Sequence, residues 1–149
     1  MYSNPQVASF IKTHFVPVRV HAKEQREQFQ QLGARFGAQW TPTILVTNSD
    51  GVERHRIEGF LPPEDFLTQL MLAVGHAAFA EGQFATAEER FRDVVAQHAF
   101  TDAAPEALYW AGVSRYKATN DPRALKETAD AFAKYPDSQW AKKASVWKA

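Results

Sequence analysis

The chain has 149 residues, and 45% of them are hydrophobic, so it can bury a core in one domain or in two small ones. Seventeen lysine and arginine residues balance seventeen aspartate and glutamate residues, and this net charge of zero argues against nucleic acid or an anionic membrane as a partner. Cysteine is absent, which excludes disulfides, thiolate metal sites and thiol nucleophiles from these residues.

The first part of the chain alternates between helical and strand-like patterns. Asn4-Pro5 is typical of a helix start, and this helix is expected to run to about His14. The segment "FVPVRVHA", residues 15–22, predicts a strand. Residues 23–36 then predict a helix that ends before Gly37.

A β-hairpin is predicted next. The apolar run 43–47 and the alternating segment "VERHRIEGF", residues 52–60, are joined by the turn "NSDG" and should pair as antiparallel strands. Pro42 stands directly before the apolar run. Because proline cannot donate a hydrogen bond to a sheet, it must open this strand.

From Pro63 onward the pattern is helical. In residues 73–95, small and large side chains recur at helical spacing, with Gly75, Ala78, Ala87 and Phe91 at the decisive positions. This pattern resembles a tetratricopeptide repeat, in which a small residue of one helix meets an alanine and a phenylalanine of the next. Residues 106–147 resemble a second, looser unit, with Gly112 and Tyr116 in its first helix and Phe132 in its second.

The order of motifs in the first half also resembles a known family. A helix, the "FVPV" segment, a helix, "TPT" with an apolar strand, the "DG" hairpin and "GF" before a helix resemble bacterial thioredoxin-like proteins that carry a helical repeat. The resemblance covers roughly residues 2–75 and implies that the Thr41–Pro42 bond is cis. The predicted fold class is α/β plus α. An incomplete thioredoxin-like fold (βαββα) occupies residues 1–67, and an all-helical tetratricopeptide-like region occupies residues 68–149.

The resemblance implies a missing central strand. In the family, a strand and a Cys-x-x-Cys motif precede the position of Met1, and the strand lies between those matching residues 15–22 and 43–47. We expect these two strands to pair directly in parallel, giving three strands, with a homodimer covering what stays exposed in the incomplete sheet. Exchange of a strand or helix with a second copy and a partly molten first half are the alternatives.

No other catalytic arrangement is visible in the sequence. The five histidines form no pair at metal-binding spacing, so a metal site is not expected. The serines lack a Gly-x-Ser-x-Gly elbow, and the glycines form no phosphate loop. We therefore predict that the chain is not an enzyme and needs no cofactor.

Two groups of residues are candidates for binding. In the family, the backbone of the residue before the cis-proline pairs with an extended peptide, so the resemblance makes Trp40, Thr41 and Pro42 a candidate peptide site. The alternative is that Trp40 belongs to the core and Pro42 only shapes a turn. A second candidate surface on the helices comprises Tyr109, Trp110, Arg115 and Tyr116. Aromatic residues at that spacing are also typical of interhelical packing.

Two functions remain open at this point. The first is a non-catalytic module that binds a protein or peptide partner; the second is the remainder of a thiol-disulfide oxidoreductase or redox chaperone whose cysteines lie upstream. An in-frame Cys-x-x-Cys before the start codon would favour the second. The N-terminal stretch 1–15 lacks the features of a secretion signal, and the apolar stretch 66–80 is interrupted, so we expect a soluble, cytoplasmic protein without a membrane partner.

Overall fold

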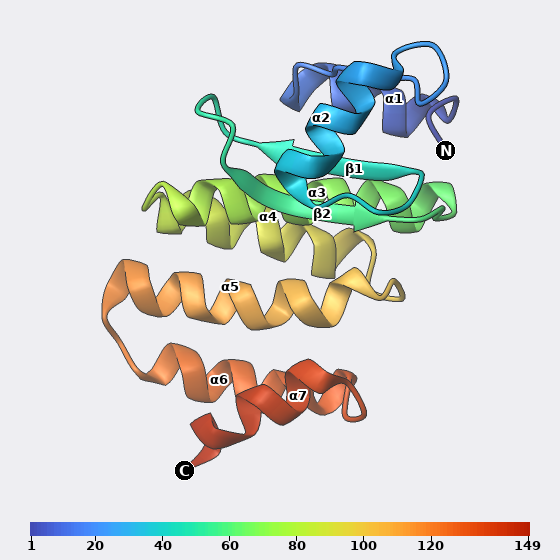
Figure 1. Cartoon of the computed structure of the whole chain (residues 1–149). Coiled ribbons are helices and arrows are strands. Elements are labelled where there is room, and N and C mark those ends of the chain that lie inside the picture. Colours follow the sequence, from blue (N-terminus) through green and yellow to red (C-terminus); the bar gives the residue numbers. More distant parts are fainter. The chain divides into compact units, whose positions relative to one another are not determined.

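A computed structural model describes all 149 residues and divides them into two compact units (Figure 1). We call Met1–Pro63 the N-terminal unit and Glu64–Ala149 the helical unit. The division falls shortly before residue 67, where the sequence suggested a boundary, because the helix that contains this residue already begins at Pro63. None of the helices combines the length and the apolar character that a membrane span requires.

The two helices of the N-terminal unit follow the sequence signals. Helix α1, Pro5–His14, begins after Asn4, whose side-chain oxygen accepts hydrogen bonds from two backbone N–H groups of the first turn. Helix α2, Arg26–Phe36, ends at Gly37, which has a φ of 65° in the left-handed region. It begins three residues later than the sequence suggested, and no side chain caps its first turn.

The predicted hairpin is confirmed. Strands β1, Thr43–Thr47, and β2, Glu53–Glu58, pair antiparallel. In the turn between them, the Asn48 side chain accepts hydrogen bonds from the backbone N–H groups of Asp50 and Val52. Gly51 has a φ of 77°, a conformation that glycine adopts without strain. These two strands form the whole sheet.

The predicted strand at residues 15–22 is wrong, and so is the three-stranded parallel sheet. Residues 16–20 are not part of any strand and form no backbone–backbone hydrogen bond, while the side chains of Val16 and Val18 are 93% and 79% exposed. Alternating valines favour an extended conformation, but a strand needs a neighbouring backbone that supplies hydrogen bonds. Pro17 also removes one of the donors.

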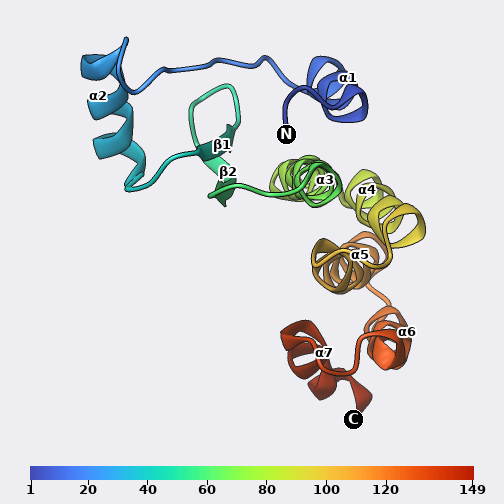
Figure 2. The same cartoon turned by 90° about the vertical axis from the view of Figure 1, so that its right-hand side faces the viewer.

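The helical unit contains five α-helices that follow one another back and forth (Figure 1), and most of them are seen nearly end-on in Figure 2. They are α3, Pro63–Ala80; α4, Phe84–Gln97; α5, Ala103–Thr119; α6, Arg123–Ala131; and α7, Gln139–Ala144. Two short 3-10 helices complete the unit: η1, Phe132–Lys134, and η2, Ser145–Lys148. The helical reading of the chain from Pro63 onward is thus confirmed.

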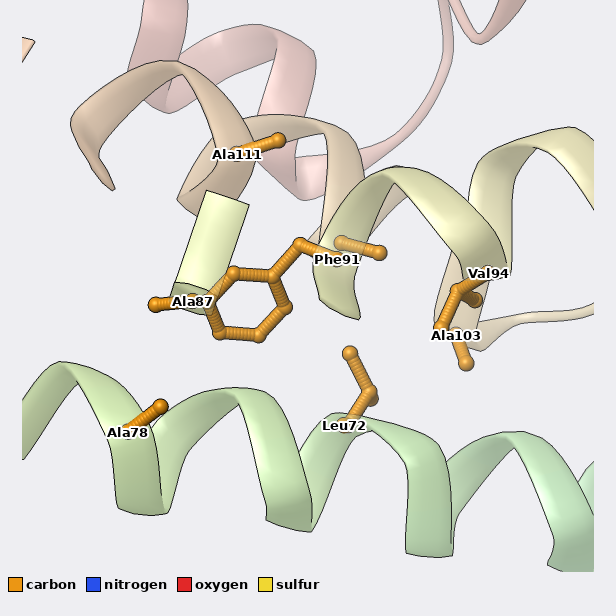
Figure 3. Packing of buried hydrophobic residues seen from close by; sticks show 8 residues of the cluster. Leu72, Ala78, Ala87, Phe91, Val94, Ala103 and Ala111 are labelled. Atoms are coloured by element: carbon orange, nitrogen blue, oxygen red, sulfur yellow. The ribbon is translucent and has the colours of Figure 1, made fainter. Parts of the chain in front are cut away.

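The core of the helical unit is built around Phe91. Its ring is fully buried and extends from α4 toward α3, where Leu72 and Ala78 lie on either side of it (Figure 3). A Cβ atom on Gly75 would lie only 2.6 Å from the ring, so α4 can approach α3 this closely only because residue 75 has no side chain. The small and large residues singled out in the sequence therefore meet in one cluster.

A second close approach joins α5 to α6. A Cβ atom on Gly112 would lie 2.1 Å from the hydroxyl oxygen of Thr128, which itself donates a hydrogen bond of 2.7 Å to the Ala124 carbonyl. Phe132 is buried with Leu108 of α5, although it lies in η1 directly after α6 rather than inside that helix. The α5–α6 contact therefore also depends on a glycine, Gly112 against Thr128, as the α3–α4 contact depends on Gly75 against Phe91.

Candidate functional site

The segment Trp40–Pro42 lies between α2 and β1 and is fixed by short hydrogen bonds on its C-terminal side. The Thr43 hydroxyl donates to the Trp40 carbonyl at 2.6 Å, and the Gly59 N–H donates to the Pro42 carbonyl at 2.8 Å. The second bond extends the β1–β2 ladder by one residue, and the Thr41–Pro42 peptide bond is cis. Pro42 therefore stands at the entrance of the strand, where its missing N–H costs nothing.

Trp40 and Thr41 present unused binding groups. The Trp40 side chain is 70% exposed, so it does not belong to the core of the N-terminal unit. Thr41 is exposed as well, and neither its backbone N–H nor its carbonyl has a hydrogen-bond partner in the chain. Strand β1 pairs only with β2, so its other edge has no strand beside it. An extended peptide can add to such an edge by main-chain hydrogen bonds.

Arg56 connects the two elements that flank this segment, α2 and the β1–β2 hairpin. Its guanidinium donates to the Phe36 carbonyl at the end of α2 and to the carboxylates of Glu53 and Glu58 on its own strand. Those carboxylates hold the pKa of Arg56 above its usual value, so the charge is permanent. The end of α2 and the hairpin are thereby tied together, and the segment that joins them has both of its ends fixed.

Exposed apolar side chains concentrate in the N-terminal unit. Large hydrophobic residues that are exposed there are Tyr2, Val16, Val18, Trp40, Val52 and Phe60, against Phe100 and Val146 in the helical unit. Apolar side chains that are exposed singly are common on protein surfaces, and only a contiguous patch of them indicates a contact with another chain.

The four helical candidate residues differ in their contacts. Tyr109 stacks on Trp147 with ring centres 4.7 Å apart, and Trp110 packs edge-on against Phe79 at 5.2 Å, so both aromatic residues serve interhelical packing. Arg115 is exposed and forms an ion pair of 3.0 Å with Glu127 of α6. Tyr116 is half-buried, and its carbonyl accepts the N–H of Asn120, the residue that follows α5.

Two histidine–carboxylate pairs in the helical unit could not be recognised from sequence spacing. His76 Nε2 lies 3.1 Å from Glu106 Oε1, and His98 Nδ1 lies 3.1 Å from Glu64 Oε1. The partners are 30 and 34 residues apart, so no local motif relates them. No group of three or more histidine, aspartate or glutamate residues is placed to hold a metal ion. The pairs therefore act as interhelical contacts.

Sequence reasoning also missed a pocket of about 790 Å³ at the end of the helical unit where α4 joins α5. Its lining residues are Ala99, Phe100, Thr101, Asp102, Pro105, Lys134, Tyr135, Ser138, Gln139 and Trp140. The Tyr135 hydroxyl donates a hydrogen bond of 2.7 Å to the Ala99 carbonyl, which joins the two connections that form the walls. The only sequence signal was an aromatic residue, Phe100, inside a helix connection.

Tyr135→Phe should destabilise the chain by about 1 kcal/mol near neutral pH, because the Ala99 carbonyl loses its donor. Burial raises the pKa of Tyr135, so its contribution is fully present below the unfolded pKa of about 10 and declines as the pH rises from there through the folded pKa. Urea unfolding at neutral pH and above pH 10 should therefore show a smaller difference between variant and parent at the higher pH. Tyr116→Phe, outside the pocket, is the control. An identical difference at both pH values would contradict the assignment.

Comparison with known proteins identifies only the first part of the chain. Residues 1–73 match the family model of the thioredoxin-like domain. No curated protein and no solved structure matches the chain. The match covers the N-terminal unit and α3 as far as Ala73, and no family match supports the tetratricopeptide resemblance of the following helices.

Proposed function

We propose that the thioredoxin-like domain matched by residues 1–73 is a non-catalytic module that binds an extended segment of a partner protein beside Trp40, Thr41 and Pro42. The observation that carries this proposal is the exposed Trp40 side chain next to a Thr41 backbone without hydrogen-bond partners. The peptide adds to the free backbone and its side chains contact the indole ring. Main-chain bonds of this kind supply affinity, and an aromatic anchor supplies much of the binding energy.

The proposal that the module is non-catalytic rests, for disulfide exchange, on the side chains available. Disulfide exchange begins with attack by a thiolate, and the chain has no cysteine. In an assay in which dithiothreitol is the reductant, we expect the chain to leave the rate of insulin reduction at the level of the buffer blank. A thioredoxin is the positive control. A rate that rises with the concentration of the purified chain, and persists after a further purification step, would refute this part of the proposal.

The helices after the domain are proposed to be tetratricopeptide-like and to belong to the same interaction module. Two helix pairs support this, α3 with α4 and α5 with α6, because each is closed at a glycine: Gly75 against Phe91 and Gly112 against Thr128. Two pairs are fewer than the three repeats that usually make an independent solenoid. In this proposal the helices therefore do not form an independent solenoid, and they extend the interaction module along the chain.

A specific observation favours the second candidate function, the remainder of a thiol oxidoreductase. Residues 16–20 alternate like a strand, yet they have no backbone–backbone hydrogen bonds and their valines at 16 and 18 are exposed. Such a segment is suited to pair with a strand supplied by another part of the same protein. The two candidate functions differ in what pairs with the free backbone of the N-terminal unit. In the first it is a partner peptide beside β1, and in the second it is a strand of the same protein that is followed by Cys-x-x-Cys.

Peptide binding is tested with ¹⁵N-labelled chain and a defined probe. An acetylated, amidated octapeptide of alternating valine and threonine is titrated, together with the same peptide carrying N-methyl groups at every second residue, which removes half of its backbone donors. We expect amide shifts at Thr41 and along β1, Thr43–Thr47, with the unmethylated peptide only. Shifts of equal size with both peptides, or no shifts in these residues, would contradict strand addition.

A further inference from the structure

The last helical segment of the chain, α7 with η2, has an exposed side on which every charged side chain is positive. Ala144 is fully buried, and the rings of Trp140 and Trp147 pack inward against Tyr109 of α5. The exposed side chains between residues 139 and 148, which we call the lysine face, are Gln139, Lys142, Lys143, Ser145, Val146 and Lys148. None of them is a carboxylate, so the lysine face has an excess of three positive charges.

The neighbouring elements do not neutralise this charge. The acidic side chains closest in sequence are Glu127 and Asp130 on α6 and Asp137 in the connection before α7. Glu127 already pairs with Arg115, and every ion pair of the structure uses arginine or histidine as its cation, so the lysines are unpaired. The helical unit as a whole has twelve aspartate and glutamate residues against ten lysine and arginine residues. The positive excess is therefore local to the lysine face.

The composition of the lysine face favours an acidic protein segment over other polyanions. A membrane surface needs apolar side chains that enter the lipid, and the only exposed apolar side chain here is Val146. Single-stranded nucleic acid stacks its bases on free aromatic rings, whereas Trp147 stacks on Tyr109. The Trp140 ring is also occupied, because the Lys143 Nζ atom lies 4.1 Å from its centre. Carboxylates of a peptide need neither feature to pair with exposed lysines.

We propose that the lysine face binds an acidic segment of a partner protein, with carboxylates of the segment paired to Lys142, Lys143 and Lys148. Opposite charges on the two partners speed their encounter and select acidic sequences. Because all three lysines are exposed, salt screens the pairs, so a short peptide binds weakly and its affinity falls as the ionic strength rises. The site lies in the helical unit and does not depend on the proposed function of the N-terminal unit.

The test uses the full chain, ¹⁵N-labelled, and two hexapeptides blocked at both ends, Gly-Glu-Glu-Glu-Glu-Gly and Gly-Gln-Gln-Gln-Gln-Gly. At millimolar concentration and low salt, the glutamate peptide should shift the amides of residues 139–148, which contain the lysine face. The glutamine peptide should bind at least about tenfold more weakly, because it has nearly the same shape and no charge. Raising the salt concentration to about 0.3 M should remove most of this difference. Equal binding of the two peptides at low salt, or shifts concentrated outside residues 139–148, would overturn the proposal.

Charge-reversal variants decide whether the lysine face or the net charge attracts the peptide. The double variant Lys142→Glu/Lys148→Glu should weaken binding of the glutamate peptide at least about tenfold. The matched control is Lys12→Glu/Lys23→Glu, which changes the net charge equally through exposed lysines of the N-terminal unit. All four lysines are exposed, so both variants are expected to fold, which circular dichroism checks. Equal losses in the two variants would show that only net charge matters, which contradicts a defined site.

An anionic membrane is the remaining occupant to be distinguished. Vesicles of phosphatidylserine and phosphatidylcholine in equal parts should not co-sediment with the parent chain at about 0.15 M salt, because the lysine face offers a single apolar side chain for insertion. Co-sedimentation of the parent chain that is lost in Lys142→Glu/Lys148→Glu would overturn the proposal in favour of a lipid surface.

Discussion

Replacing Phe91 by alanine should lower the free energy of unfolding of the helical unit by about 3–5 kcal/mol. The side chain is fully buried, and the cluster that it occupies joins α3, α4 and α5, so its removal leaves a cavity at the contact of three helices. The measurement is urea unfolding followed by circular dichroism, to which the helices contribute most. A loss below about 1 kcal/mol would show that this core can collapse around the gap.

The glycine opposite Phe91 provides an independent check on the same contact. Gly75→Ala should cost about 1–3 kcal/mol, since the added Cβ atom would lie within 3.0 Å of three atoms of a buried ring. In a Phe91→Leu background the same change should cost less. Gly33→Ala in α2 is the control, because the nearest atom there, the Ala38 carbonyl oxygen, is at an ordinary 3.5 Å. Equal costs of Gly75→Ala in both backgrounds would contradict the contact.

Trp40→Ala should weaken binding of the valine–threonine octapeptide by about 2 kcal/mol, or roughly thirtyfold, while stability stays unchanged. The side chain is 70% exposed in the free chain, so its removal creates no cavity. The affinity is measured from the ¹⁵N titration. Val52→Ala is the control for loss of an exposed apolar side chain in the same unit. If both variants bind the peptide as the parent does, Trp40 is not an anchor.

Local chemistry made the elements around the candidate site predictable. The cap of Asn4, the positive φ of Gly37 and the turn of Asn48 act within a few residues, so the bounds of α1, the end of α2 and the hairpin could be inferred directly. The position of Pro42 at the strand entrance follows from its missing N–H in the same way. Exposure of Trp40 could not be decided, because it depends on which elements surround the loop.

Features that depend on distant partners were predicted less well. Residues 15–22 have the alternation of a strand, but whether a strand forms depends on a neighbouring backbone that the sequence pattern does not reveal. The sequence left undecided whether Tyr109 and Trp110 bind a partner or pack between helices. Their ring contacts with Trp147 and Phe79 show that they take part in packing. The pocket beside Phe100 is lined by residues of two helix connections that lie far apart in the sequence, so no local sequence motif predicts it.

The most direct test of strand addition at the N-terminal unit is hydrogen exchange at the Thr41 amide. In the free chain this N–H has no hydrogen-bond partner, so it should exchange at close to the rate of an unstructured peptide. Saturation with the unmethylated octapeptide should slow its exchange at least about tenfold, because the N–H then donates to a peptide carbonyl. An exchange rate at Thr41 that stays unchanged while the peptide is bound would contradict the proposed mode of binding.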